Sequence, residues 1–187
     1  MVTQIQDRLQ PALLDRLIDD ERAVRTDADA ARVMNKGQMR GAVLRDLAWL
    51  LNAVQPLSSE DARQHPQAAQ SVLNFGLPPM AGQLASRVDV PTLERLMRQA
   101  ILRFEPRILS GTLTVKALEF SSVLDTHNVI EFEIRGHLWA QPVPMELLLR
   151  TRLDLEAGQI EVRETGRSVL AATPSGVAGA AGAGGRA

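Results

Sequence analysis

The run Ile130-Glu131-Phe132-Glu133-Ile134-Arg135 decides the fold class, because apolar and charged residues alternate along it with a period of two. Successive side chains of a β-strand point to opposite faces of the sheet, so this run predicts a strand with one buried and one solvent-exposed face. A second run has the same period, with one apolar face formed by Met145, Leu147, Leu149, Leu153 and Leu155. We therefore expect two strands of an antiparallel sheet here.

Two further segments extend the expected sheet. Ile160 and Val162 continue the pattern after residues 156–158, which form a loop of hairpin length. Residues 113–120 predict a first strand, in which the alternation slips by one position at Ala117-Leu118 and so indicates a β-bulge. The C-terminal part of the chain is thus expected to hold three or four antiparallel strands.

Amphipathic helices precede these strands. A short helix is predicted after Pro11, with apolar residues at Leu13, Leu14, Leu17 and Ile18. A longer helix, expected to end near Pro56, has an apolar stripe at Met39, Val43, Leu47, Leu50 and Val54. A third helix has Asp89 as its N-cap candidate and Pro91 in its first turn. Its stripe consists of Leu93, Leu96, Met97, Ala100, Ile101 and Phe104, and Pro106 ends it.

The order of these elements predicts an α+β fold. N-terminal helices would pack their apolar stripes on one face of a C-terminal sheet of three to four antiparallel strands. Residues 55–70 are expected to be a loop and residues 71–80 an ordered turn that enters the core, followed by a short helix over residues 81–87.

Composition excludes several classes of function. The 187 residues have a formal net charge of -1, so no overall positive charge attracts the chain to nucleic acid or an anionic membrane. The chain has no cysteine, which excludes disulfides, thiolate nucleophiles and Cys-bound metals. A membrane span needs roughly 20 consecutive apolar residues, and no stretch approaches this length. With no secretory signal, a cytoplasmic location is expected.

The polar residues form no recognisable catalytic or metal-binding pattern. His65, His127 and His137 lack the spacing of a metal-binding helix, and no G-x-S-x-G nucleophile motif occurs. A glycosidase needs two carboxylates across a cleft, whereas the acidic residues are expected on exposed faces, in loops or, for Glu105, two residues from Arg107. We expect no catalytic residue, no metal and no cofactor.

Arginines and a tryptophan offer candidate binding surfaces. Arg95, Arg98 and Arg103 share the polar face of the third helix, with Arg107 just past its end, so they form either a patch for an acidic partner or, as we favour, a solvated face. Trp49 lies opposite the apolar stripe of its helix, one turn from Arg45. It either packs against a second layer, which we favour, or anchors a partner protein.

The segment Glu105-Pro106-Arg107 lies where the third helix gives way to the sheet. Proline biases the preceding residue away from helix, so the chain should leave in an extended conformation. Positions two apart in an extended chain point to the same side. Glu105 and Arg107 are therefore expected to project together as one acceptor and one forked donor on a stiff support.

Three motifs in this order resemble the TssE subunits of the bacterial type VI secretion baseplate. They are residues 45–52 (RDLAWLLN), residues 71–78 (SVLNFGLP) and Glu105-Pro106-Arg107. TssE subunits are related to a wedge protein of contractile phage tails and are often labelled lysozyme-like. The resemblance covers roughly residues 10–165 and departs from the family at Phe75, where tyrosine is as frequent, and in the Gly/Ala-rich tail.

The resemblance implies a structural, non-enzymatic subunit of a cytoplasmic baseplate docked at the inner membrane. Its partners would be the core bundle of other wedge subunits, contacted through Glu105, Pro106 and Arg107, and the sheath proteins, whose polymerisation it would start. Family members resemble a sheath domain that links subunits through shared strands, and an exposed sheet edge suits that role. Trp49 is the further partner-binding candidate. No nucleic acid, small-molecule substrate or direct membrane insertion is expected.

The chain is accordingly divided into three parts. Residues 1–36 would form an N-terminal helix and charged linker, residues 37–167 the baseplate wedge domain, and residues 168–187 a disordered Gly/Ala-rich tail. The alternative function, which the lysozyme-like label suggests, is a peptidoglycan hydrolase, and the missing carboxylate pair disfavours it.

Overall fold

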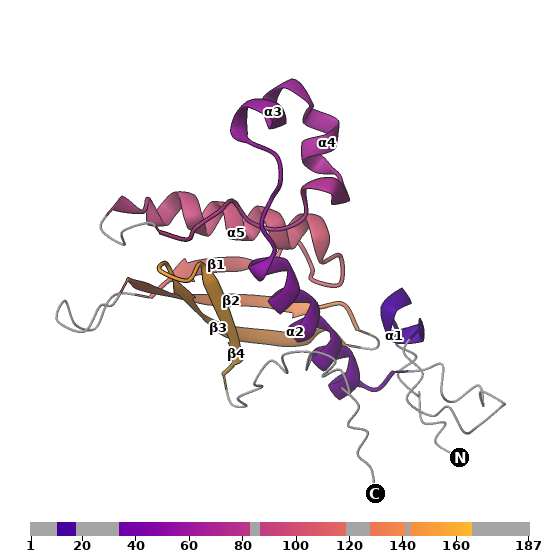
Figure 1. Ribbon diagram of the computed structural model, residues 1–187. Helices are drawn as coiled ribbons and strands as arrows, with labels where there is room; N and C mark the ends of the chain where they lie inside the picture. The colour runs from indigo at the N-terminus through magenta and orange to yellow at the C-terminus, as the bar shows by residue number, and fades with distance from the viewer. Residues whose placement is uncertain (1–10, 18–33, 83–86, 119–127, 141–142, 166–187) are drawn as a thin grey trace, which may run out of the picture.

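The computed structural model describes residues 11–17, 34–82, 87–118, 128–140 and 143–165. Helical elements come first: α1 (Leu13–Leu17), α2 (Lys36–Asn52), α3 (Ser59–Gln64), α4 (Pro66–Gln70), the 3-10 turn η2 (Val72–Asn74) and α5 (Val90–Phe104). The strands follow: β1 (Thr114–Ala117), β2 (Val129–Leu138), β3 (Met145–Asp154) and β4 (Gln159–Glu164). They form one four-stranded antiparallel sheet in the order β1-β2-β3-β4, which confirms the predicted α+β fold (Figure 1).

The two long strands have the register that their alternation predicts. β2 and β3 pair along their whole length, from Val129 opposite Asp154 to Leu138 opposite Met145. Along β2 the apolar residues Ile130, Phe132, Ile134 and Leu138 are buried, while the charged residues between them lie on the opposite face. The sheet therefore has one face for the core and one for solvent.

Helices α2 and α5 cover the buried face of the sheet (Figure 1). α2 begins with a capping box in which Asn35 and Gln38 each accept a hydrogen bond from the other's backbone N–H, at 2.8 and 2.9 Å. α5 begins after Asp89, as predicted, with Pro91 in its first turn. Buried residues of both helices and of all four strands form one cluster, so the two helices lie on the same face of the sheet.

Residues 55–70 are not the loop that the sequence predicted, because they contain α3 and α4. Ser58 caps α3 by accepting a hydrogen bond from the Asp61 N–H at 3.1 Å, and Pro66 occupies the first turn of α4. Neither helix contains a buried residue, so no apolar stripe marks them in the sequence. In Figure 1 they project above α5, on the side away from the sheet.

The turn at residues 71–80 enters the core only in part. Asn74 and Leu77 are buried, whereas Val72 and Leu73 are exposed. Val54, predicted as the last residue of the α2 stripe, lies beyond the helix and is exposed, because the chain there forms a parallel bridge to Leu77.

The predicted bulge in the first strand is not found in its described part. Ala117 pairs with Phe132, and the Leu118 N–H donates to Glu131 O at 2.9 Å, so the register runs on without an extra residue. Residues 119–120 lie outside the described residues, as do Ile18, most of the expected helix over residues 81–87 and the tail over residues 168–187.

Candidate protein-binding site

The site begins where α5 ends. The helix stops at Phe104, and Glu105 has a non-helical backbone (φ -121, ψ 79) while its N–H still donates to Ile101 O at 2.9 Å. Pro106 prevents the helix from continuing, because its ring cannot be accommodated in a further helical turn, and it restricts the backbone at this point. Only 3% of the Glu105 surface is exposed, so this carboxylate is buried.

Glu105 and Arg107 lie on the same side of the chain, as predicted, and bind one another. Oε1 of Glu105 accepts hydrogen bonds from Nε of Arg107 at 2.7 Å and from its backbone N–H at 3.1 Å. Oε2 accepts from Nη2 of Arg107 at 2.5 Å. The pair is thus a bidentate guanidinium–carboxylate contact, in which both carboxylate oxygens of Glu105 accept hydrogen bonds from Arg107.

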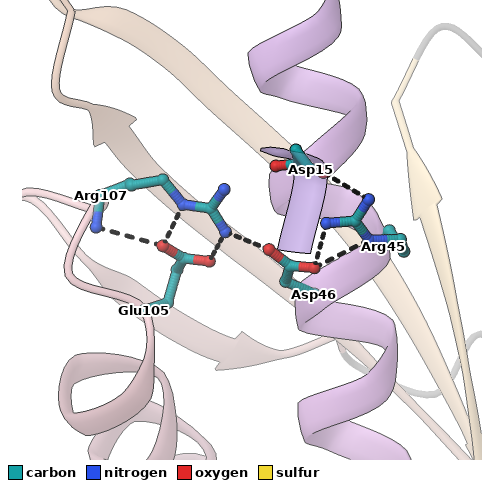
Figure 2. A network of polar contacts seen from close by, with 5 residues as sticks. All are labelled: Asp15, Arg45, Asp46, Glu105 and Arg107. Carbon is teal, nitrogen blue, oxygen red and sulfur yellow. Dashed lines mark hydrogen bonds and ion pairs between the residues drawn. The ribbon is translucent and has the colours of Figure 1, made fainter. Parts of the chain in front are cut away.

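The same guanidinium reaches α2. Nη2 of Arg107 also donates to Oδ2 of Asp46 at 2.5 Å, and Oδ1 of Asp46 accepts from Nε of Arg45 at 2.9 Å. Arg45 in turn donates through Nη1 to Oδ1 of Asp15 in α1 at 2.6 Å. Figure 2 shows the resulting chain of alternating charges, Asp15, Arg45, Asp46, Arg107 and Glu105, which joins α1, α2 and the exit from α5.

These contacts keep both guanidinium groups charged. Burial of Arg107 disfavours the charged form, but hydrogen bonds and charge attraction from Glu105, and then from Asp46, outweigh burial and raise the pKa of Arg107 above its usual value. Burial opposes the charge of Arg45 as well, but contacts with Asp15 and Asp46 outweigh it and raise the pKa of Arg45. Arg107 is therefore a permanent cation fixed in position by two carboxylates.

Backbone contacts with the end of β2 hold this segment from the other side. Leu109 N–H donates to His137 O at 2.8 Å, and Trp139 N–H donates to Arg107 O at 2.7 Å. Ile108 and Leu138 form an antiparallel bridge between these two bonds. The segment after α5 is thus hydrogen-bonded to the end of β2, and these bonds restrict the movement of the segment.

Trp49 is on the surface, which contradicts the prediction that it packs against a second layer. Its side chain is 54% exposed, and the Arg45 guanidinium lies over its ring at 5.2 Å from the centroid. This is the geometry of a cation–π contact. It links Trp49 to the charge network through Arg45.

Trp139 is a surface residue that the sequence reasoning missed. It is 50% exposed and directly follows Leu138, the last buried residue of β2. The alternation along β2 could have identified it, because the position after a buried residue falls on the solvent face. Its backbone bond to Arg107 places it at the edge of the network.

The arginines of α5 do not form one patch with Arg107. Arg98 donates through Nε to Leu113 O at 3.1 Å, and Arg103 donates through Nη1 to Ala69 O at 2.9 Å, whereas Arg107 turns to Glu105 and Asp46. The predicted solvated face of α5 therefore carries arginines that also bind neighbouring backbone.

Metal-binding clusters and membrane-spanning helices are both absent from the described residues. In these residues, no three His, Asp or Glu side chains lie close enough together to hold a metal ion. No helix in the same residues is long and apolar enough to span a membrane.

Comparison with known proteins identifies the family of the chain. No curated protein and no solved structure matches the chain. The family model described as baseplate wedge protein gp25 matches residues 37–143, which run from α2 to the loop after β2 and include all of the site except Asp15. Because the match covers more than half of the 187 residues, the chain belongs to the baseplate wedge protein gp25 family of structural proteins.

Proposed function

We propose that this protein is the type VI secretion baseplate subunit that binds the core bundle of the wedge and starts polymerisation of the contractile sheath. Membership of the gp25 family supports a baseplate role. The three motifs that resemble TssE favour a secretion system over a phage tail. The single observation that carries the binding site is the fixed guanidinium of Arg107 between Glu105 and Asp46.

The geometry suits recognition because Arg107 is held in place before any partner arrives. Its Nε and Nη2 bind Glu105 and Asp46 (Figure 2). No hydrogen bond of Nη1 occurs among the described residues. Its side chain remains 21% exposed. A partner carboxylate or carbonyl could therefore bind Nη1 without ordering a flexible side chain, which lowers the entropic cost of association.

The surface residues beside the network favour a protein partner. Trp49 and Trp139 are each about half exposed, and each is joined to one of the arginines, by ring stacking with Arg45 or by a backbone bond to Arg107. Tryptophan and arginine are the residue types most enriched at the energetic centres of protein interfaces. Trp49, Pro106 and Arg107 would thus contact the wedge bundle, with Glu105 as the buried support of Arg107.

Co-purification with the wedge subunits of the same gene cluster tests this proposal. Arg107→Lys keeps the charge but loses the fork, and Trp49→Ala removes an exposed ring, so neither leaves Glu105 without a cation. Each is expected to weaken the complex on the order of tenfold or more, since interface centres contribute about 2 kcal/mol or more apiece. Arg63→Lys is the matched control, because Arg63 forms an exposed ion pair with Glu60 within α3, away from the sheet.

The readouts separate binding from folding and from sheath initiation. Thermal melts of the free variants must match that of the unaltered chain. In cells that carry a fluorescent sheath protein, both site variants should reduce the number of sheaths, and the control should not. Normal co-purification by well-folded Arg107→Lys and Trp49→Ala variants would contradict the assigned surface.

A further inference from the structure

The short helix α1 presents its apolar side to solvent and its charged side to the protein. Leu13 and Leu17 are 71% and 72% exposed, and Leu14 is exposed as well; these three residues form the leucine ridge of α1. Asp15 lies two positions from both Leu13 and Leu17, which is the opposite side of a helix with 3.6 residues per turn. The Asp15 side chain is only 11% exposed. α2 and α5 have the reverse arrangement, because their apolar residues enter the core.

The described contact between α1 and the rest of the chain is polar. Oδ1 of Asp15 accepts a hydrogen bond from Nη1 of Arg45 at 2.6 Å, whereas the leucine ridge belongs to neither apolar cluster of the described residues. A helix of five residues gains too little from its own hydrogen bonds to be stable alone, because isolated helices shorter than about 12 residues are marginal in water. The position of α1 therefore depends on Arg45, and burial of Leu13 and Leu17 contributes little to it.

The contact with Arg45 also fixes which side of α1 faces outward. Arg45 is itself held in place, because its Nε donates to Oδ1 of Asp46 and its guanidinium lies over the ring of Trp49. Figure 2 shows Asp15 at one end of the charge network, which continues through Arg45 and Asp46 to Arg107. The leucine ridge is thus held outward next to the surface that we assign to the wedge bundle.

The size of the leucine ridge decides between two kinds of partner. Specific protein interfaces bury about 1,200–2,000 Å² in total, with about 20–30 residues on each side. Three leucines of a five-residue helix are far too few to hold two copies of the chain together. They can extend a larger interface beside them, and the surface around Trp49 and Arg107 is joined to α1 through Arg45.

The leucine ridge lies outside the part of the chain that the family model matches. The match begins at residue 37, so it includes Arg45, Trp49 and Arg107 but not α1. The domain shared with the family therefore supplies the arginine that holds α1, and a segment before that domain supplies the apolar side chains.

We propose that the leucine ridge of α1 inserts into an apolar groove of the wedge bundle, and that the ion pair between Asp15 and Arg45 orients it for this contact. The inference rests on the proposed function, because it adds an apolar contact to the surface around Trp49 and Arg107. Amphipathic helices bind grooves in this way, with apolar side chains one turn apart as the anchors. Because Arg45 holds α1 before the partner arrives, less conformational freedom is lost on binding.

The first experiment removes the leucine ridge without disturbing the domain. The variant Leu13→Ala, Leu17→Ala shortens two side chains that are exposed in the free chain, so its melting temperature should match that of the unaltered chain. Its affinity for purified wedge subunits of the same gene cluster should fall on the order of tenfold or more, because it loses apolar area that the partner would bury. Leu73→Ala is the matched control, since Leu73 is 70% exposed on η2 and outside the charge network.

Amide hydrogen exchange of the unaltered chain tests the same contact without a variant. Exchange at residues 13–17 should be fast in the free protein, because a five-residue helix with an exposed apolar side opens easily. Addition of the wedge subunits should slow it. Unchanged exchange at these residues in the complex would contradict the insertion of α1.

A double-mutant cycle tests the orienting role of Asp15. Asp15→Asn keeps the leucines but removes the charge that binds Arg45, so it should weaken the complex. If Asp15 acts through the leucine ridge, Leu13→Ala, Leu17→Ala should cost less affinity in the Asp15→Asn background than in the unaltered chain. Equal costs in the two backgrounds would mean that Asp15 does not orient the ridge.

The outcomes separate this inference from the proposed function. Full affinity of the leucine variant, beside a loss for Arg107→Lys, would overturn the role of α1 and leave the proposed function in place. An equal loss for Leu73→Ala would also overturn it, because the effect would not be particular to α1. If sedimentation velocity shows a dimer that the leucine variant abolishes, the ridge joins two copies of the chain instead. If the unaltered chain binds no wedge subunit, the proposed function itself fails.

Discussion

Nη2 of Arg107 lies 2.5 Å from Oδ2 of Asp46, although the two residues are 61 positions apart in the sequence. This contact makes α2 part of the binding site. Without it, Arg107 would be held only by the Glu105 carboxylate and by backbone bonds to the end of β2. The contact also joins two of the motifs noted in the sequence, RDLAWLLN and Glu105-Pro106-Arg107. Asp46 in the first motif and Arg107 in the second bind one another.

We predict that Glu105→Gln destabilises the fold much more than the same change at Glu161. Both glutamates stand two positions before an arginine and pair with it, but Glu105 is buried whereas the Glu161 and Arg163 side chains are 41% and 55% exposed. Loss of the buried charge should lower the free energy of unfolding by about 1.5–3 kcal/mol, the range for hydrogen bonds to charged groups. An exposed pair contributes about 0–1 kcal/mol.

Urea denaturation of the two variants beside the unaltered chain measures this difference. The midpoints should separate clearly, with equal slopes if both variants remain two-state. Equal losses of stability at the two sites would mean that the network around Arg107 is worth no more than a surface ion pair.

We predict that replacing Gly76 by any residue with a side chain destabilises the protein. Gly76 has a φ of +115, and a Cβ built on it would lie 2.2 Å from Ala53 O. Gly76→Ala must therefore move backbone that also carries the bonds between Gln55, Leu77 and Ala53, and we expect a loss of more than about 2 kcal/mol or failure to fold.

Gly41→Ala is the opposite control. Gly41 lies inside α2 on an exposed position, where an added Cβ would meet no neighbouring side chain within 4 Å. Alanine there should raise stability by about 0.5–1 kcal/mol, because it restricts the unfolded chain and favours helix. Thermal melts of the two single variants decide the matter, and a Gly76→Ala protein as stable as the unaltered chain would refute the geometry.

The elements that the sequence predicted well are those with one face in the core. Phe132 and Ile134 in β2, and Met97 and Ile101 in α5, are buried at the period of their element, so hydrophobic spacing located them. α3 and α4 bury nothing and leave only local signals such as the Ser58 cap, which a cluster of prolines and polar residues obscured.

At the site, sequence reasoning reached the local part and missed the distant part. The shared side of Glu105 and Arg107 follows from an extended backbone around proline, which is a local property. Burial of Glu105, the bond from Arg107 to Asp46 and the position of Trp139 depend on how α2 and β2 pack against the exit from α5. Periodicity within one element carries no information on such contacts.

The protein should not hydrolyse peptidoglycan, which is the activity implied by the lysozyme-like label. A glycosidase needs a carboxylic acid free to protonate the leaving group, and both oxygens of the buried Glu105 instead accept hydrogen bonds from Arg107. Cell-wall suspensions treated with the purified chain should keep their turbidity across a range of pH. Clearing that disappears with Glu105→Gln or Asp46→Asn would establish the enzymatic alternative.

The two tryptophans provide a direct probe of the proposed interface. The chain contains two tryptophans, and the side chains of both are about half exposed. Incorporation of 5-fluorotryptophan should therefore give two fluorine resonances, which Trp49→Phe and Trp139→Phe assign one at a time. In the free protein both resonances should shift between H2O and D2O, because both rings contact solvent. On addition of unlabelled wedge subunits, the Trp49 resonance should move and lose this isotope shift, since residues at the centre of an interface are cut off from water. If gel filtration shows that the complex has formed while the Trp49 resonance keeps its position and its isotope shift, Trp49 lies outside the interface, and the binding surface must be sought on another face of the molecule.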